Sequence, residues 1–496
     1  MRKISALYPA DDPEGYLQYA DWGPRDNQLV YAYGNNIYYL SEVNSTHHPI
    51  TTNGVESVIF NGVPDWLYEA WWRKPYHFPV GGGPTQPFQL APERREATPR
   101  YARPVSACVV YEQSPPSRKG WVDLQGPIFF GQGGKNWYLR LPLPEGKHGH
   151  YQHVAMANND ILFIWIFRYY LTTLENRPGE RHLFSVSGKK ARSATFTKCL
   201  TCEEGESCLF FNVIFSPDSQ YYVLECLGPG VPKVEIRSIY NQTFDVLDAN
   251  DDLSDLLKER TLPQIRTFQV PLRGGYKAQV RLFLPPGIKE DEVLLYPLIV
   301  FADSAPGSQL VTAEFQLHWG SYLSSRRNHI YAWIDGRGSG SQGDKMMHEV
   351  YYRLGSVEVE DQIEVTRYLK DNLAFVHPKH TAIWGWFYGG YVAALALASE
   401  NTVFKCAISV APVTSWLYYD SVYTERYMGT PLPQDNYLGF EKSSLVKKAH
   451  KFKGKKFLLM HGTADNKVHV QQSLMFIKAL VDEGVLFQTQ VSVIVL

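Results

Sequence analysis

A glycine-rich turn between a strand pattern and an alanine-rich helix pattern is the stretch whose residues suggest chemistry. Residues 381–384 read as a short buried strand, and glycines follow at 385, 389 and 390. This is the spacing of a nucleophile elbow, G-x-S-x-G, in which a strained central residue presents a serine hydroxyl above a sheet. Phe387 stands at the central position, and its phenyl ring cannot attack a carbonyl carbon. The spacing therefore predicts the elbow without its nucleophile.

Longer matches surround this turn. Residues 385–392, Gly-Trp-Phe-Tyr-Gly-Gly-Tyr-Val, resemble the Gly-Trp-Ser-Tyr-Gly-Gly-Tyr-Val of the dipeptidyl peptidase IV and fibroblast activation protein branch of the prolyl oligopeptidase family. Further segments agree with that branch, namely residues 335–345, 354–363, 418–429 and 461–465. The chain is therefore identified as a relative of this branch. Its members release N-terminal Xaa-Pro dipeptides from peptides through an acyl-enzyme.

The resemblance assigns roles to four residues of the catalytic constellation. Phe387 stands at the nucleophile position, and Asp465 in His-Gly-Thr-Ala-Asp stands at the triad carboxylate. The backbone N–H of Tyr388 would be one oxyanion donor. The family's second donor is a tyrosine hydroxyl, and Phe301 is assigned to that position. Losing one such donor costs on the order of 3 kcal/mol in the transition state.

The triad histidine is expected to be absent. In the family it follows a strand that corresponds to the one beginning at Phe487 and Gln488, but here the sequence diverges over residues 489–496 and ends. The sheet is expected to lack that last strand. His469 lies four residues after Asp465 and is expected to head the next helix rather than act as a substitute base.

Substrate-binding positions are also implied by the resemblance. Glu69 matches the start of a glutamate run that holds the substrate's N-terminal ammonium in the family, although a lone glutamate is more often a solvated surface residue. The proline pocket is expected to be lined largely by flat aromatic rings, which suit the ring of proline because it carries no N–H. Its lining is Val413, Trp416, Tyr419, Tyr423 and Val468.

The six cysteines bear on metal binding and on compartment. Cys199-Leu-Thr-Cys202 could be half a zinc site or a redox pair, but no second C-x-x-C or histidine pair follows at zinc spacing, so no metal is expected. The family pairs the cysteines that match Cys199 with Cys202 and Cys208 with Cys226. These disulfides imply an oxidising compartment. The family partner of Cys406 has no counterpart here, so its thiol is expected to be free.

Two domains are expected. The lead-in Trp22-Gly-Pro24 recurs as Phe215-Ser-Pro217 before a strand, which suggests blades of a β-propeller over residues 1–265. Residues 73–127 contain ten prolines and are expected to be irregular and to leave the propeller incomplete. Strand and helix patterns then alternate over residues 266–496, which predicts a doubly wound, mostly parallel α/β-hydrolase sheet. This second domain is expected to be truncated at its C-terminus.

Net charge, apolar runs and glycosylation sequons bear on the binding partners of the chain and on its cellular compartment. The 496 residues carry a net charge of −1 without basic blocks, which argues against nucleic acid. No cofactor is expected. Residues 1–9 do not form a signal peptide, and no apolar run reaches membrane-spanning length. The resemblance nevertheless implies an extracellular or cell-surface protein, and Asn44 and Asn241 lie in glycosylation sequons that agree with it.

Three functional hypotheses stay open. The chain is an active peptidase whose sequence is faulty, a non-catalytic relative that acts by binding protein, or an aberrant product that folds poorly. As written, the chain is expected to be inactive, because it lacks the nucleophile and the triad histidine. The family forms homodimers partly through C-terminal helices, and this chain is expected to give no ordered dimer but a monomer prone to aggregate.

Overall fold

The computed structural model describes residues 17–22, 28–42, 45–54, 120–121, 129–130, 136–144, 149–158, 162–163, 169–187, 196–216, 220–240, 243–289 and 294–493. Glu69, Asn44 and Asn241 lie outside these residues, as does the tract 73–127 except for residues 120–121. The chain divides into two compact units, Met1–Ala107 with Phe215–Ser219, and Cys108–Ile214 with Gln220–Leu496.

The described residues of the first unit form an antiparallel sheet. Its strands follow in chain order, as β1 (Tyr19–Trp22), β2 (Leu29–Tyr33), β3 (Asn36–Leu40) and β4 (His48–Pro49). The turn between β2 and β3 is a two-residue hairpin turn in which Gly34 and Asn35 both have positive φ.

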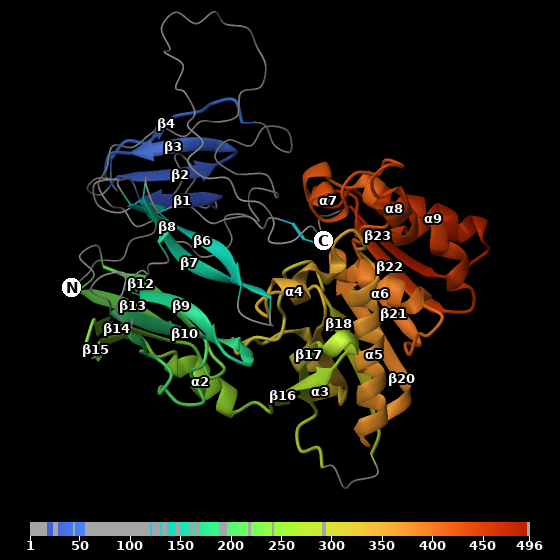
Figure 1. Ribbon diagram of the computed structural model, residues 1–496, viewed down its shortest axis with the longest axis horizontal. Helices are drawn as coiled ribbons and strands as arrows, with labels where there is room; N and C mark the ends of the chain where they lie inside the picture. The colour runs from blue at the N-terminus through green and yellow to red at the C-terminus, as the bar shows by residue number, and fades with distance from the viewer. Residues whose placement is uncertain are drawn as a thin grey trace, which may run out of the picture. The chain divides into compact units, whose positions relative to one another are not determined.

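The second unit begins with three further antiparallel sheets (Figure 1). The first has strands β5 (Phe129–Phe130), β6 (Asn136–Pro144), β7 (His150–Asn158) and β8 (Leu162–Phe163). The next has β9 (Tyr169–Leu174), β10 (Arg177–Ser187) and β11 (Phe196–Cys199), and the third has β12 (Phe211–Phe215), β13 (Tyr221–Cys226), β14 (Lys233–Ser238) and β15 (Thr243–Asp248). Small sheets whose strands follow in chain order are typical of propeller blades. Helix α2 (Asp251–Lys258) follows.

An eight-stranded sheet forms the rest of the second unit. Its spatial order is β16-β17-β19-β18-β20-β21-β22-β23, with β17 antiparallel to both of its neighbours and the other pairs from β19 onward parallel. The strands are β16 (Gln264–Pro271), β17 (Lys277–Leu284), β18 (Tyr296–Ala302), β19 (Ile330–Asp335), β20 (Val376–Trp386), β21 (Cys406–Val410), β22 (Lys456–Gly462) and β23 (Gln488–Ser492). This is the mostly parallel sheet that the alternating pattern predicts.

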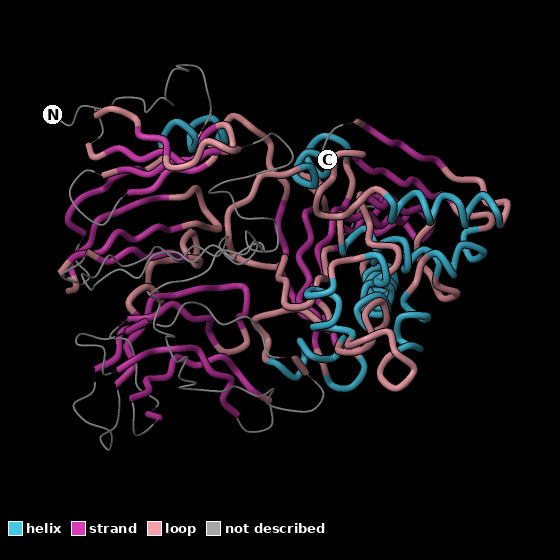
Figure 2. Tube along the Cα trace, turned by 90° about the horizontal axis from the view of Figure 1, so that it is seen from above, coloured by secondary structure: helices cyan, strands magenta, loops and turns pink. Residues whose placement is uncertain are grey.

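Alternating side chains of the central strands fill two cores. In β19, Ala332 and Ile334 belong to the large core that also buries most of helix α6, whereas Trp333 belongs to a smaller aromatic core that Leu323 of α3 covers. Figure 2 shows that most helical residues lie along this sheet. The helices are α3 (Trp319–Arg327), α4 (Asp344–Met347), α5 (Val357–Asn372), α6 (Tyr388–Ala398), α7 (Ser421–Met428), α8 (Tyr437–Ser443) and α9 (Gln471–Asp482).

The expectation that the sheet lacks the strand after Gln488 is wrong. Strand β23 pairs in parallel with β22, with Gln488 opposite Leu458 and Ser492 opposite Gly462. Its sequence differs from the family pattern, but Thr489 and Val491 are β-branched, and pairing uses backbone groups that every sequence supplies. The edge of the sheet is therefore β23.

Both expected disulfides are present in the structure, Cys199–Cys202 and Cys208–Cys226. Cys406, at the start of β21, has a free thiol whose pKa is raised by burial. No helix among the described residues combines the length and the apolar character needed to cross a bilayer.

Candidate active site

The elbow forms although its centre is a phenylalanine. Strand β20 ends at Trp386, helix α6 begins at Tyr388, and Phe387 between them has φ 57° and ψ −113°. Its N–H donates to the carbonyl of Val410 over 2.9 Å, and its carbonyl accepts from Tyr391 N–H over 3.2 Å. A non-glycine residue with positive φ is strained by about 1–3 kcal/mol. The surrounding sheet and helix therefore impose the elbow on a residue that disfavours it.

Close packing explains why the turn needs glycine. A Cβ atom built on Gly389 would lie 1.9 Å from the carbonyl oxygen of Ala302, which ends β18. One on Gly385 would lie 2.4 Å from the backbone of Gly389. Any side chain at these two positions would push β18, β20 and α6 apart. The glycine spacing thus follows from the approach of the three backbones.

The buried carboxyl group of Glu358 in α5 holds the residue that follows the centre of the elbow. Tyr388 follows Phe387, and its hydroxyl donates to Oε1 of Glu358 in α5 over 2.8 Å. Glu358 is buried, and its carboxyl also accepts from the backbone N–H groups of Gly355 and Ser356. Burial raises the pKa of Glu358 and raises that of Tyr388 well above its ordinary value. Sequence reasoning recorded Glu358 only as part of a matching segment, and its place in the first turn of a helix was the available signal.

Tyr388 keeps one requirement of an oxyanion hole. It is the first residue of α6, and the N–H groups of a helix's first turn have no acceptor within the helix. Its backbone N–H is therefore not used by a hydrogen bond within α6, as the predicted role of an oxyanion donor requires.

The predicted proline-pocket residues lie together, and the ring of Phe387 lies among them. The Trp416 ring stacks on Tyr423 with centroids 6.0 Å apart, and Tyr419 meets both edge-on. The Phe387 ring centroid is 5.7 Å from that of Tyr419 and 6.3 Å from that of Tyr423, edge-on to each. Val413 and Val468 are fully buried in the core against which these rings pack. We call Phe387, Trp416, Tyr419 and Tyr423 the aromatic box.

The aromatic box is electrically neutral. Burial raises the pKa of Tyr423, and the nearby charge of Asp303 adds to the rise. Burial also raises the pKa of Tyr419, with added effects from Asp420 and Asp465. Neither phenol ionises near neutral pH, so the box offers hydrocarbon and ring edges rather than charge.

Asp465 is held by its own loop. Its Oδ1 accepts from the backbone N–H groups of Lys467 and Val468, both over 2.9 Å. The imidazole near it is that of His461, whose Nε2 is 3.8 Å from Asp465 Oδ2. That Nε2 lies 2.7 Å from the carbonyl oxygen of Val468, which can only accept, so Nε2 carries the proton.

His461 is consequently not available as a general base. Its Nδ1 accepts from the hydroxyl of Ser473 over 2.7 Å, and its ring is buried. Burial lowers the pKa of His461, which keeps the ring neutral. His469 is exposed, and its Nδ1 accepts from Gln471 N–H at the start of α9, where the sequence analysis placed it.

Phe301 is the last but one residue of β18. It is paired in register with Trp384, and its ring packs 4.8 Å from the Trp384 ring in the aromatic core beneath α3. Asp303 instead follows the end of the strand, and its Cα lies 3.1 Å from the Cβ position built on Gly389. Burial raises the pKa of Asp303. Sequence reasoning missed Asp303, although residues after the carboxyl ends of parallel strands are the usual place for a site.

The described site combines an elbow centred on Phe387 with the carboxylate of Asp465 in a neighbouring loop. The elbow and the loop carboxylate are in place on a doubly wound sheet, which defines an α/β-hydrolase. Two family models match the chain, the prolyl oligopeptidase family over residues 315–493 and the dipeptidyl peptidase IV N-terminal region over residues 2–70 and 168–233.

Curated relatives agree with these matches. The chain is 33% identical to dipeptidyl peptidase 4 of Felis catus, over 95% of this chain and 76% of that protein. It is 32% identical to venom dipeptidyl peptidase 4 of Apis mellifera, over 95% and 75%. It is 30% identical to inactive dipeptidyl peptidase 10 of Rattus norvegicus, over 99% and 74%. The chain therefore belongs to the dipeptidyl peptidase IV branch of the prolyl oligopeptidase family.

A solved structure supports the fold. The crystal structure of Porphyromonas gingivalis dipeptidyl peptidase 4 superposes with a TM-score of 0.64 at 21% identity. The match covers 98% of this chain, and this chain spans 61% of that one.

Proposed function

We propose that this chain is a non-catalytic member of the dipeptidyl peptidase IV branch that acts by binding protein. The observation that carries the proposal is Phe387, which holds the strained elbow conformation and packs its ring edge-on against Tyr419 and Tyr423. Acyl transfer by this family's chemistry needs a hydroxyl at that atom position. A phenyl ring supplies none.

The same ring also competes with substrate. Tyr419, Tyr423, Trp416, Val413 and Val468 are the residues proposed to receive proline, and Phe387 makes edge-on contacts with two of them. Such aromatic pairs contribute about 0.5–1.5 kcal/mol each beyond their buried area. We infer that the ring of Phe387 stands in for the proline side chain and closes the pocket. The chain would then neither bind nor cleave Xaa-Pro peptides.

Non-catalytic relatives give the proposal a precedent. The rat relative, 30% identical, is named an inactive dipeptidyl peptidase. By the same likeness we place this chain outside the cell or at its surface, and its two disulfides agree with an oxidising compartment. Asn44, Asn241 and Glu69 stay proposals as glycosylation and ammonium-binding residues.

The peptidase hypothesis stays the second candidate because part of the machinery is intact. Asp465 is fixed in its loop, Tyr388 offers its N–H, and Glu358 supports the elbow. A native serine at position 387, with a histidine beyond residue 488, would restore the family's constellation.

A fluorophosphonate probe separates the two candidates, because it bonds covalently to an activated serine. Purified chain is incubated with the probe beside Sus scrofa dipeptidyl peptidase 4, a 34% identical relative, as a positive control. We expect labelling of the relative and none of this chain above its heat-denatured sample. A labelled peptide from the elbow or from any other serine of this chain would contradict the proposal.

A further inference from the structure

A buried arginine on β17 has hydrogen-bond donors without acceptors. Arg281 is 8% exposed, and its Nε donates to Oγ1 of Thr267 over 3.1 Å. This is the one hydrogen bond that Arg281 makes with the residues the structure describes, and none of their carboxylates lies within ion-pair distance of it. Burial lowers the pKa of Arg281 to about 10, so its guanidinium still carries a full charge near neutral pH. Burying such a charge is costly unless it is paired.

Asp335 does not serve as the counter-ion of Arg281. Its charge acts on Arg281 from a distance, but both oxygens of its carboxyl group accept from the backbone N–H groups of Leu310 and Val311. Burial also raises the pKa of Asp335 to about 7, so near neutral pH this carboxyl carries only part of a negative charge. The positive charge of Arg281 is therefore not fully offset by the described residues.

A second donor without an acceptor lies on the same face of the sheet. Arg281 is paired in register with Trp333 of β19, and the ring of His318 stacks on Trp333 with centroids 4.7 Å apart. His318 also meets Phe283 edge-on, and Phe283 is two residues along β17 from Arg281. The Nδ1 of His318 accepts from Gly320 N–H over 2.9 Å, so the proton of the neutral ring is on Nε2. That buried Nε2–H has no acceptor among the described residues.

The surroundings of His318 favour a negative charge. Burial and the charge of Arg281 lower the pKa of His318 to about 4, so the ring is neutral near pH 7 and donates through Nε2. His318 is also the N-cap residue of α3, and the N-terminus of a helix carries a partial positive charge. A guanidinium, a ring N–H and a helix N-terminus thus lie in one region, with a net charge of about +1 from the guanidinium.

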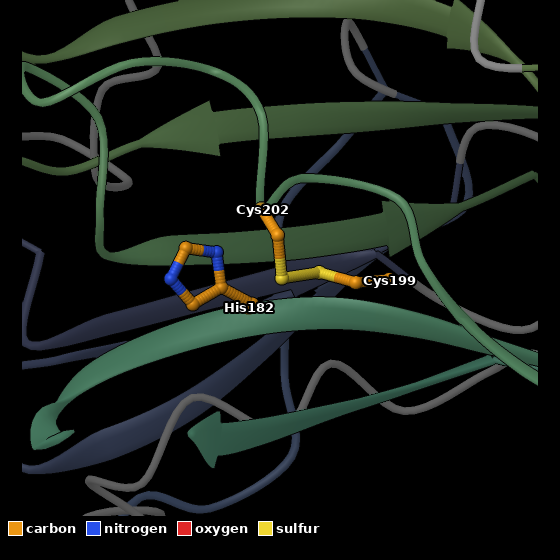
Figure 3. A group of neighbouring side chains, drawn as sticks. All are labelled: His182, Cys199 and Cys202. Atoms are coloured by element: carbon orange, nitrogen blue, oxygen red, sulfur yellow. A yellow bond between two sulfur atoms is a disulfide. The ribbon is translucent and has the colours of Figure 1, made fainter. Parts of the chain in front are cut away.

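The buried histidine in Figure 3 shows how such a group is ordinarily satisfied. A ring nitrogen of His182 lies within 4.8 Å of both sulfur atoms of the Cys199–Cys202 disulfide, but these sulfur atoms are joined to each other. Its Nδ1 is 3.3 Å from the carbonyl oxygen and from the hydroxyl of Thr201, and its Nε2 is 3.2 Å from the carboxylate of Glu180. Both nitrogens of His182 therefore have partners, in contrast to Nε2 of His318.

We propose that the guanidinium of Arg281 and the Nε2–H of His318 bind one chloride ion between them. Chloride accepts hydrogen bonds from both donors and supplies the single negative charge that the guanidinium lacks. A monatomic ion suits this place because Nε2 of His318 is buried and the rings of Phe283 and Trp333 pack against the imidazole. The site contains no residue of the elbow or of the aromatic box, so it is independent of the proposed function.

The test uses the full chain in potassium chloride, potassium bromide or potassium gluconate at equal ionic strength, with thermal unfolding followed by circular dichroism. An ion that binds only the folded chain raises the melting temperature with the logarithm of its concentration above the Kd. We expect this rise in chloride and in bromide, but not in gluconate, which is too large to enter. The chlorine NMR line of chloride should be broadened by the folded chain, and bromide should narrow it again by displacing one ion per chain.

Two arginine variants locate the site. Arg281→Met removes the charge from a side chain of similar length and should abolish the response to chloride. Arg273→Met is the matched control, because the side chain of Arg273 is 79% exposed, and it should keep the full response. Equal melting temperatures in chloride and gluconate, a response that survives in Arg281→Met, or one that is lost in Arg273→Met would each overturn the proposal. Should Arg281→Met not fold, the unaltered chain decides: a chlorine line that bromide does not narrow would overturn the proposal as well.

Discussion

At the scale of single residues, Phe387 decides both the chemistry and the strain of the elbow. Its backbone keeps the conformation that presents a nucleophile, because Gly385 and Gly389 let β20, β18 and α6 approach closely. Its ring removes the nucleophile and joins the aromatic box. One substitution therefore alters the reacting atom and the pocket together.

This strain can be measured with two variants that both delete the ring. Phe387→Ala keeps a Cβ at φ 57°, whereas Phe387→Gly removes it. Relief of about 1–3 kcal/mol of strain exceeds the roughly 0.5–1 kcal/mol by which glycine favours the unfolded chain. We expect the glycine variant to be more stable by about 1 kcal/mol in urea unfolding. An alanine variant of equal or greater stability would show that the turn relaxes without a Cβ penalty.

At the scale of elements, the carboxyl group of Asp335, at the end of β19, holds the loop that follows β18. Asp335 accepts from the backbone N–H groups of Leu310 and Val311, over 3.0 and 2.8 Å. Burial raises the pKa of Asp335 to about 7. Ionising it in the folded state is therefore unfavourable, although its hydrogen bonds hold the loop.

The raised pKa predicts a pH dependence of stability with a definite sign. Between the unfolded value of 3.8 and about 7, the folded chain holds a proton on Asp335 that the unfolded chain has lost. Stability from this group therefore falls as pH rises through that range, by up to about 1.4 kcal/mol per pH unit. Asp335→Asn has no carboxyl group to ionise at this position. The melting temperature of the variant should therefore rise relative to that of the unaltered chain between pH 5 and pH 7, and the difference between the two should stay constant at higher pH. A difference that stays constant with pH would refute the assignment.

The elements were largely predictable from sequence, but parts of the site were not. The short buried strand at residues 381–384 and the glycines that follow it predicted β20 and α6, because the backbones of these elements approach closely. Phe301 was assigned to the oxyanion position because residues 300–306 match the family's Val-Tyr-Ala-Gly-Pro, and that assignment stays a prediction. Strand register decides such positions, and it puts Ala302 beside Gly385 and Asp303 next to the elbow. The contact of His182 with two cysteines needs strand pairing, which no local pattern reveals.

At the scale of the whole molecule, the exposed edge strand of the hydrolase sheet leads us to expect self-association. Strand β23 is the last strand of that sheet, and four of its five residues are exposed. Leu486 before it and Val493 after it are 90% and 86% exposed. An uncovered strand with apolar neighbours tends to pair with other chains.

We therefore expect a monomer that self-associates through β23 rather than an ordered dimer. Sedimentation velocity at micromolar concentration should show a monomer boundary with faster heterogeneous material. Val491→Lys, at a 41% exposed position on β23, should reduce that material, whereas Thr463→Lys, in the exposed turn after β22, serves as the charge-matched control. A single reversible dimer boundary, unaffected by Val491→Lys, would contradict this prediction.

The most direct test of the non-catalytic assignment is turnover of a Gly-Pro chromogenic amide by the unaltered chain and by Phe387→Ser. The serine variant restores the hydroxyl. His461 stays hydrogen-bonded to Val468 and Ser473, so the described site still has no general base to take the proton of that hydroxyl. We predict that neither protein hydrolyses the amide above buffer, while Sus scrofa dipeptidyl peptidase 4 does under the same conditions. Turnover by the unaltered chain, or recovery by Phe387→Ser to within tenfold of that relative, would contradict the account.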